Sequence, residues 1–339
     1  MASHKKINPR IVVYGLGFVG KQLAGFALDK GWEIVGAYNR AGAKVGQDLG
    51  TLIGRAPIGL VVEDCDKVNF TSLKADVGFV AMNDRLAENF AAYERLLGAG
   101  INVLCHGSES NNPCRANPEL AAKIESMAKQ HDVTFTGGGI WDMTRVWAGI
   151  IVAGPAIKIE SMHHISNTEI SRQGVHLLRR LGGGLTVAEY EAQGIAKHKG
   201  ISGIPSIPSL CVVDGLGFDV KEIKEHIEPI VWEVTHFSKA LNQELSPGTV
   251  VGTRMLVDIT TEQGPTVHSC FEYREFREGE VEEMRWKVKG KPGMEICITR
   301  EDSDMASASS LFNRTPDIIE AEPGIVEMWK YRPLRPSIF

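Results

Sequence analysis

The sequence predicts an α/β fold in two parts: an N-terminal parallel sheet covered by helices, then an α+β domain with a mixed or antiparallel sheet. Through about residue 140, short apolar runs alternate with helical segments, and this alternation implies βαβ crossovers. From Val250 onward, long strand candidates follow one another with only short turns between them, as antiparallel strands do.

In the N-terminal part, the run Ala75–Met82 is apolar throughout, as a strand covered on both faces should be. The other segments are assigned from β-rich composition or from apolar residues spaced about 3.6 apart. We expect strands at Arg10–Tyr14, Glu33–Tyr38, Gly100–Cys105 and Val133–Thr136, with weaker signals at Leu60–Val62 and Val68, and helices at Phe18–Lys30, Leu86–Leu97 and Pro118–Gln130.

The pattern changes after Ile140, which predicts a second domain over residues 141–302. Residues 262–265 and 277–280 have the composition of hairpin turns. Residues 303–319 return to helical spacing, so we expect residues 303–339 to pack back on the first domain, residues 1–140. In the second domain we expect strands at Ile157–His164, Val250–Thr260, Val267–Phe276, Val281–Val288 and Glu295–Arg300, and helices at Thr186–Ala196 and Ile207–Leu216.

Charge and composition exclude several classes of function. The chain has 339 residues and a formal net charge of −5, which argues against a nucleic-acid or anionic-membrane surface. No segment approaches the roughly 20 apolar residues of a membrane span, and the polar start is unlike a secretory signal. Six cysteines lie scattered without a CxxC pair, so we expect reduced thiols, a cytoplasmic location and no metal site.

The stretch GLGFVG at residues 15–20 has the spacing G-x-G-x-x-G between an expected strand and an expected helix. Gly15 allows a tight turn, Gly17 lets the backbone approach a diphosphate, and Gly20 lets the helix pack closely on the strand. Phe18 and Val19 then open a helix whose positive end stabilises phosphate groups. This context predicts a Rossmann dinucleotide-binding domain in preference to a tight turn without a ligand.

The end of the second expected strand bears on the choice of cofactor. An acid there would bind the ribose 2′-hydroxyl of NAD(H) and repel a 2′-phosphate. This chain has Asn39 and Arg40 instead, followed by Lys44. A guanidinium can bind a phosphate through two parallel hydrogen bonds and can stack on adenine. We therefore predict NADP(H) as the preferred cofactor and NAD(H) as the alternative. The competing interpretation of Arg40 and Lys44 is that they are surface charges.

Nicotinamide sites in such folds lie beyond the carboxyl ends of the parallel strands, so candidates come from the loops after strands. Ala81 and Met82 follow one strand and are expected to line the cofactor cleft. The loop at residues 106–113 carries a lone carboxylate, Glu109. The loop at residues 137–142 combines three glycines with Trp141, which offers close backbone approach and an aromatic wall.

Several longer stretches, taken in order, carry a family resemblance. They are IVGAYNRAGAKVGQDLG, the Glu109 loop leading to NPELAAKIESMAKQHDVTFTG, GISGIPSIPSLCVVDGLGFDVKEIKEHIEPIV, SPGTVVGTRM and SASSLFNRTPDIIEAEPGIVEM. Together they resemble the dihydrodipicolinate reductase-like family, in particular the branch of the 2,4-diaminopentanoate dehydrogenases and native amine dehydrogenases. The resemblance covers nearly the whole chain.

This resemblance implies a homodimer that interconverts an amine with a ketone and ammonia, through an imine, with NAD(P). In that branch a glutamate after the fifth strand holds the amine or ammonia, and by position this residue is Glu109. The residues themselves agree, since a carboxylate in a partly apolar pocket can bind a cationic nitrogen and carry its protons. A solvated loop acid or a helix cap is the competing interpretation of Glu109.

The expected substrate pocket departs from the family. Related enzymes have an asparagine- or histidine-Pro-Gly-Phe stretch after the glycines, whereas this chain has Trp141, Asp142, Met143 and Thr144. Trp141 is a candidate pocket wall or a core aromatic residue. Asp142 is a candidate for binding a polar group of the substrate. The competing interpretation is that it pairs with Arg145, three residues further along a helix.

Dihydrodipicolinate reductases have a pair of adjacent histidines, followed by a lysine that binds the dicarboxylate substrate. Here His163 and His164 keep the pair, but Asn167 stands in place of the lysine, so we disfavour that substrate. In a strand one histidine should face inward and the other outward, and His163 remains a candidate for the pocket. The stretch from Asn111 to Cys114 resembles the loop that carries the nucleophilic cysteine of semialdehyde dehydrogenases, with His106 in the same loop as a candidate base. The flanking sequence fits the amine dehydrogenase branch better, so we favour the interpretation of Cys114 as a buried or half-buried small residue.

The leading hypothesis is an NADP(H)-dependent amine dehydrogenase acting on a small amine or amino acid. One alternative is hydride reduction of a cyclic imine or an unsaturated ring without ammonia. The other is a regulator that binds NADPH without turnover.

Overall fold

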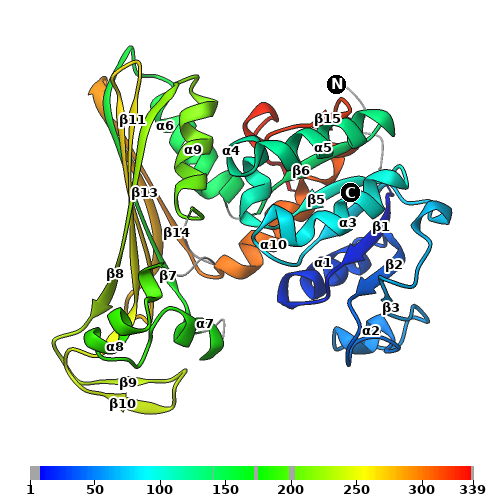
Figure 1. Cartoon of the computed structure of the whole chain (residues 1–339), viewed down its shortest axis with the longest axis horizontal. Coiled ribbons are helices and arrows are strands. Elements are labelled where there is room, and N and C mark those ends of the chain that lie inside the picture. Colours follow the sequence, from blue (N-terminus) through cyan, green and yellow to red (C-terminus); the bar gives the residue numbers. More distant parts are fainter. Residues whose placement is uncertain (1–7, 140, 172–174, 198–202, 337–339) are drawn as a thin grey trace. The chain divides into compact units, whose positions relative to one another are not determined.

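The computed structural model describes residues 8–139, 141–171, 175–197 and 203–336, apart from the side chains of residues 141–143. The chain divides into two compact units (Figure 1). Unit 1 comprises the residues through Met143 together with the segment from Asp304, and unit 2 runs from Thr144 to Ser303. Among the described helices none is long and apolar enough to cross a membrane.

Unit 1 is built on a seven-stranded parallel sheet in the order β15-β6-β5-β4-β1-β2-β3. The middle of this order places β1 beside β4, so the chain crosses from one half of the sheet to the other at this point, where open α/β sheets bind ligands. The strands are β1 Arg10–Tyr14, β2 Glu33–Asn39, β3 Glu63–Asp64, β4 Val77–Val80, β5 Asn102–Cys105, β6 Thr134–Gly137 and β15 Gly324–Ile325.

Helices cover both faces of this sheet, because successive residues of each strand point to opposite sides. On one side α1 and α10 pack against Val13 and Phe79, and on the other α3 and α5 pack against Val80 and Phe135. The helical segments of unit 1 are α1 Phe18–Asp29, α2 Leu49–Leu52, η1 Phe70–Ser72, α3 Leu86–Gly98, η2 Ser108–Asn111, α4 Pro113–Ala116, α5 Pro118–Gln130, α10 Ser303–Asn313, α11 Thr315–Ile319 and η6 Met328–Lys330.

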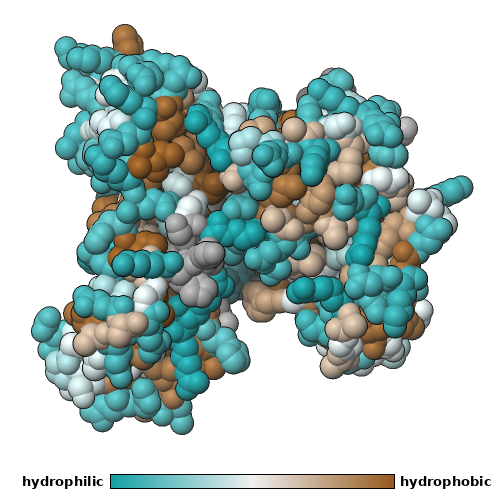
Figure 2. Space-filling model, viewed as in Figure 1, coloured by the Kyte–Doolittle hydropathy of each residue, from teal (hydrophilic) through white to brown (hydrophobic). Residues whose placement is uncertain are grey.

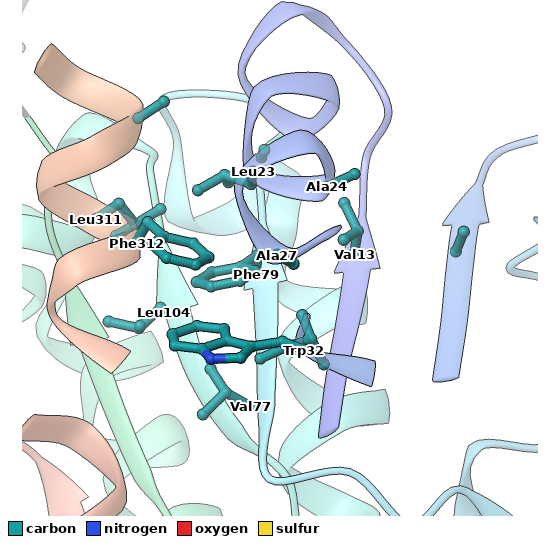
Figure 3. Packing of buried hydrophobic residues seen from close by; sticks show 14 of the residues in the cluster. Val13, Leu23, Ala24, Ala27, Trp32, Val77, Phe79, Leu104, Leu311 and Phe312 are labelled. Carbon is teal, nitrogen blue, oxygen red and sulfur yellow. The ribbon is translucent and has the colours of Figure 1, made fainter. Parts of the chain in front are cut away.

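The C-terminal segment is part of the core of unit 1. The ring of Phe312 in α10 stacks on Trp32 at 4.4 Å between centroids and on Phe79 of β4 at 6.0 Å (Figure 3). Residues 303–319, expected to be helical, form two helices, since α10 ends at Asn313 and α11 begins at Thr315. Pro316 fits the first turn of α11 but cannot continue the helix from α10, because it has no amide hydrogen to donate.

Unit 2 is built on a six-stranded mixed sheet in the order β14-β13-β7-β12-β11-β8. Only the pair of β7 and β12 is parallel among the described pairings of this sheet. The strands are β7 Lys158–Glu169, β8 Val220–Val231, β11 Val250–Thr261, β12 Thr266–Arg274, β13 Glu282–Lys291 and β14 Met294–Arg300, and β9 His236–Ser238 pairs separately with β10 Gln243–Leu245.

One face of the six-stranded sheet is covered by helices, with α6 against β13 and β14 and α9 against β8 and β11. The opposite face presents polar and charged side chains that alternate with buried residues along β7, β11, β12 and β13. In the view of Figure 2, hydrophilic residues and smaller apolar patches both reach the surface of unit 2 and of unit 1. The remaining segments are η3 Trp141–Trp147, which is π-helical, α6 Ala148–Ala153, α7 Val175–Arg180, α8 Val187–Ala192, η5 Ile195–Lys197 and α9 Ser206–Gly215.

The α/β fold class, with a parallel sheet followed by a mixed one, is therefore confirmed.

Candidate active site

The glycine turn follows β1 and is closed by backbone contacts that leave no room for larger residues. Gly15 has φ +93°, and a Cβ atom there would lie 2.5 Å from the carbonyl oxygen of Ala81. A Cβ atom on Gly20 would collide with the carbonyl oxygen of Gly15. No atom lies within 4 Å of a Cβ built on Gly17, so the turn is packed on the inside and open at its tip.

The tip of the turn is the start of α1. Gly17 is the N-cap, no side chain caps this end, and the first turn holds no acidic residue. Phe18 is 63% exposed, and Val19 packs partly against the core. The amides at this helix N-terminus therefore face an open space, and their partial positive charge suits an anion such as the diphosphate of a dinucleotide.

Asn39 and Lys44 both contact the glycine turn through Leu16. The side-chain oxygen of Asn39 accepts a hydrogen bond from the amide of Leu16 at 3.3 Å. The amine of Lys44 donates one to the carbonyl oxygen of Leu16 at 2.8 Å. These contacts tie the end of β2 and the following loop to the cofactor turn, so both residues have a structural role in addition to any contact with a ligand.

Arg40 extends from the same end of β2 and is exposed, with no hydrogen bond or ion pair from its guanidinium to the described residues. A buried acid that sequence reasoning missed lies next to this strand end. Asp64 of β3 pairs in register with Asn39, and its carboxylate is 3.4 Å from the amine of Lys67. Because β3 has only two residues, its weak sequence signal did not place this acid at the strand end.

Ala81 and Met82 lie against the glycine turn. The amide of Ala81 donates to the carbonyl oxygen of Tyr14 at 2.9 Å, and the Cγ atom of Met82 would lie 2.8 Å from a Cβ atom on Gly15. The structure thus brings together every residue predicted for the cofactor site at the carboxyl end of β1, β2 and β4.

Glu109 lies in η2, the turn after β5, and its carboxylate has two partners. One oxygen accepts from the guanidinium of Arg85 at 2.7 Å, and the other accepts from the amide of Leu86 at 2.7 Å. Leu86 is the first residue of α3, so Glu109 satisfies an amide at the N-terminus of a helix distant in sequence. A carboxylate can accept about four hydrogen bonds, so these two contacts leave room for a cationic ligand.

His106 follows β5 directly and contacts the C-terminal segment. Its Nε2 atom lies 2.8 Å from the hydroxyl oxygen of Ser307 in α10. Gly139, in the loop after β6, has φ +127°, and a Cβ atom there would lie 3.1 Å from this hydroxyl and 3.2 Å from the imidazole. Two loops after strands and one helix therefore meet at this histidine, which sequence reasoning mentioned only beside Cys114.

The family model described as the 2,4-diaminopentanoate dehydrogenase C-terminal domain matches residues 148–335, more than half of the chain. The chain belongs to this family. A 2,4-diaminopentanoate dehydrogenase of Acetoanaerobium sticklandii is 27% identical over 249 residues, which are 69% of this chain and 69% of that protein. The structure of an amine dehydrogenase from Mycobacterium smegmatis is similar with a TM-score of 0.84 and 29% identity, covering 98% of this chain and 100% of that one.

A scyllo-inositol dehydrogenase from Lactobacillus casei shares the fold alone, with a TM-score of 0.59 and 14% identity over 96% of this chain and 92% of that one. The family resemblance drawn from the sequence is confirmed, and this member of the 2,4-diaminopentanoate dehydrogenase family is an oxidoreductase. Dehydrogenases of this kind imply a nicotinamide cofactor. The open, uncapped start of α1 is compatible with the diphosphate of such a cofactor.

Of the residues predicted for the substrate pocket of this family member, His163 is the one with a described side chain. The side chains of Trp141 and Asp142 lie outside the described residues. His163 lies on the sheet face opposite α6 and α9, where its ring stacks on His268 with centroids 5.1 Å apart. Its position gives no support to a role in a pocket beneath those helices.

His164 points the other way, as alternation in a strand requires, and is buried between the rings of Phe271 and Trp286. Within the part of the chain that the structure describes, neither of its ring nitrogens has a hydrogen-bond partner. Burial lowers its pKa well below the ordinary value, and the charges of Arg145 and Arg300 add to this shift. Arg145 is buried with its guanidinium 3.2 Å from the hydroxyl of Ser166. The expectation that one histidine faces inward and the other outward is confirmed.

One group of possible metal ligands occurs among the described residues, namely Asp64, Cys65 and Asp66. The two carboxylates already pair with cations, Asp64 with Lys67 and Asp66 with Arg95 at 2.6 Å. Cys114 is exposed in the first turn of α4.

Proposed function

We propose that this protein is an NAD(P)H-dependent amine dehydrogenase. It would convert a ketone, ammonia, NAD(P)H and a proton into an amine, water and NAD(P)⁺, through an imine and reversibly. The observation that carries the proposal is the carboxylate of Glu109 at the carboxyl edge of the parallel sheet, in the same unit as the open glycine turn. The relatives that act on amines by name support the same reaction.

The proposed role of Glu109 is to bind ammonium or the substrate amine. Its ion pair with Arg85 and its contact with the α3 amide fix the carboxylate in one orientation. An oriented anion on a rigid loop attracts a cationic nitrogen without reorganising when the ligand arrives. The bound cofactor supplies the hydride, and the protein holds the nitrogen and limits the access of water. Trp141 and Asp142 are proposed to shape the substrate pocket.

We further propose that NADP(H) is the preferred cofactor, because Arg40 is free to bind a 2′-phosphate at the end of β2. NAD(H) is the alternative, and the buried carboxylate of Asp64 next to Asn39 is the observation that favours it. Among the described residues Cys65, Cys105, Cys270 and Cys297 are free thiols, and we propose a reducing cytoplasm as the location, because reduced thiols are typical there.

A homodimer is also proposed, formed through the open face of the six-stranded sheet. Ile165 is 49% exposed near the middle of this face. Around it lie charges that are paired within the face, such as Arg254 with Glu228 and Glu272, each at 2.8 Å. A face with exposed apolar residues and internally neutralised charges can pack against a second copy of itself.

The test is a screen of ketones with ammonium and NADPH, run beside a screen of amines with NADP⁺, with the nicotinamide absorbance as the readout. The proposal expects NADPH oxidation that requires both ketone and ammonium. Oxidation with a cyclic imine and no ammonium would indicate the alternative of imine or ring reduction. Tight NADPH binding without turnover on any substrate would indicate a cofactor-sensing protein and contradict the proposal.

A further inference from the structure

Reductive amination, on which this inference rests, needs more proton transfer than Glu109 is placed to provide. Ammonium must lose a proton before it attacks the ketone, and the carbinolamine hydroxyl must gain one before it leaves as water. The guanidinium of Arg85 and the N-terminus of α3 both stabilise negative charge on Glu109. Both carboxylate oxygens are already engaged by these donors, which suits a group that holds the nitrogen while a neighbouring group takes up and returns the proton.

His106 belongs to the same loop as Glu109 and has the properties of such a group. It follows β5 directly, three residues before Glu109, and is partly buried. Its Nε2 atom is engaged with Ser307, while its Nδ1 atom has no hydrogen-bond partner among the described residues. Burial lowers the pKa of this imidazole, and the carboxylate of Asp84 partly opposes the shift. The ring is therefore neutral near pH 7 and can accept a proton at Nδ1.

The hydroxyl of Ser307 fixes the orientation of this ring. Ser307 is buried in α10, whose Leu311 and Phe312 belong to the apolar core of unit 1, so its position is set by the fold. Gly139 closes the other side, because any larger residue would press on both Ser307 and His106. A neutral imidazole held through one nitrogen keeps the second nitrogen in a constant direction, as acid–base catalysis requires.

We propose that His106 is the acid–base residue of the amination step and that Ser307 is its positioning residue. Nδ1 of His106 takes a proton from ammonium held by Glu109. The ammonia formed adds to the ketone carbon, and proton transfer from nitrogen to oxygen gives the neutral carbinolamine. Imidazolium then returns its proton to the hydroxyl, the C–O bond breaks, and water leaves the iminium ion. His106 ends in its starting state, and the iminium carbon is ready to accept a hydride.

The charged groups near His106 are Asp84, whose carboxylate accepts from the hydroxyl of Ser108 at 2.6 Å, and Glu109 in the same loop. The charge of Asp84 favours the imidazolium form. Since the neutral form must start the cycle, kcat for amination should fall as the pH drops below the pKa of His106.

The experiment compares His106→Ala and His106→Gln with the wild type, using the ketone found in the screen with ammonium and NADPH. We expect kcat to fall by about 10²-fold or more in both variants and the acid limb of the pH profile to disappear. Added imidazole should restore part of the activity of His106→Ala. Glutamine keeps a neutral hydrogen-bonding side chain but cannot carry a proton. A loss of activity in a folded His106→Gln variant would therefore report on proton transfer and not on folding. Ser307→Ala should keep the acid limb but shift it, with a smaller loss of kcat.

The matched control is His131→Gln at the exposed end of α5, which should keep the wild-type kcat and pH profile. NADPH affinity, measured by fluorescence titration, should stay within about twofold in every variant if the role is in proton transfer. A wild-type acid limb in His106→Gln, or no rescue of His106→Ala by imidazole, would overturn the assignment of His106 alone. A wild-type enzyme without ammonium-dependent turnover would instead overturn the proposed function and this inference with it.

Discussion

The carboxylate of Glu109 and the guanidinium of Arg85 form an ion pair at 2.7 Å in which only 12% and 23% of the two side chains remain exposed. The pair joins the turn after β5 to Arg85, which is the N-cap residue of α3. Shielding from water strengthens such a contact relative to a surface ion pair. Glu109 therefore has both a helix-capping role and the proposed amine-binding role, and a useful substitution must separate the two.

Replacing Glu109 with glutamine makes this separation. The amide oxygen of glutamine can still accept from the amide of Leu86, so we expect the unfolding free energy to fall by only about 1 kcal/mol. Loss of the negative charge removes the attraction for ammonium, so kcat/KM for ammonium should fall by about 10²-fold or more. Glu119→Gln, an exposed acid in the first turn of α5, is the matched control. Ammonium-dependent turnover at the wild-type level in Glu109→Gln would contradict the proposed role.

Replacing Arg40 with alanine tests the choice of cofactor. Arg40 is exposed and its guanidinium makes no hydrogen bond or ion pair with the described residues, so its loss should leave the melting temperature unchanged. We expect the ratio of kcat/KM for NADPH to that for NADH to fall by about tenfold, which is the lower range for a charged hydrogen bond. Lys74→Ala, an exposed lysine elsewhere in unit 1, should not change this ratio. An unchanged ratio in Arg40→Ala would indicate that Asp64 and NAD(H) define the site.

Alanine at Gly17 and at Gly20 should have different consequences, although both residues belong to one motif. At Gly17 the added methyl group meets no atom within 4 Å, so the fold should tolerate it while the group occupies the space expected for the diphosphate. At Gly20 the methyl group collides with the backbone of Gly15, so the turn itself must distort. Cofactor affinity should therefore drop in both variants, but the melting temperature should drop only in Gly20→Ala. Equal melting temperatures would show that the turn adapts.

The parallel sheet was predictable because β1 and β4 are short apolar runs that are each followed by a helix with regular apolar spacing. The carboxyl ends of those strands then located the cofactor residues around Gly15 and Ala81 without further information. The strand β8 was not assigned, since its apolar residues Val220, Ile223, Ile227 and Ile230 recur with helical spacing. It is an edge strand that pairs only with β11, and an edge strand tolerates the proline at position 229.

The candidate site was predictable only in part, because some of its contacts join residues far apart in the chain. Nothing in the sequence near Glu109 indicates that Arg85 and Leu86 would bind its carboxylate. The pairing of His106 with Ser307 spans 201 positions and depends on how α10 packs against the core of unit 1. The alternation of a strand did predict that the two adjacent histidines face opposite sides, but it could not decide which of them is buried.

His164 should make stability depend on pH. Its pKa is lowered in the folded state, so between the folded and unfolded values the unfolded chain binds more protons than the folded one. The contribution of His164 to stability is therefore present above the unfolded pKa of about 6.5 and is lost as the pH falls toward the folded value.

In His164→Phe, which keeps a ring between Phe271 and Trp286, this loss is absent. We expect urea unfolding to show a slope for the wild type of up to about 1.4 kcal/mol per pH unit below pH 6, and a shallower one for the variant. His131→Gln should follow the wild type, because His131 is exposed. Parallel pH dependence in His164→Phe and the wild type would mean that the pKa of this histidine is the same in the folded and the unfolded chain.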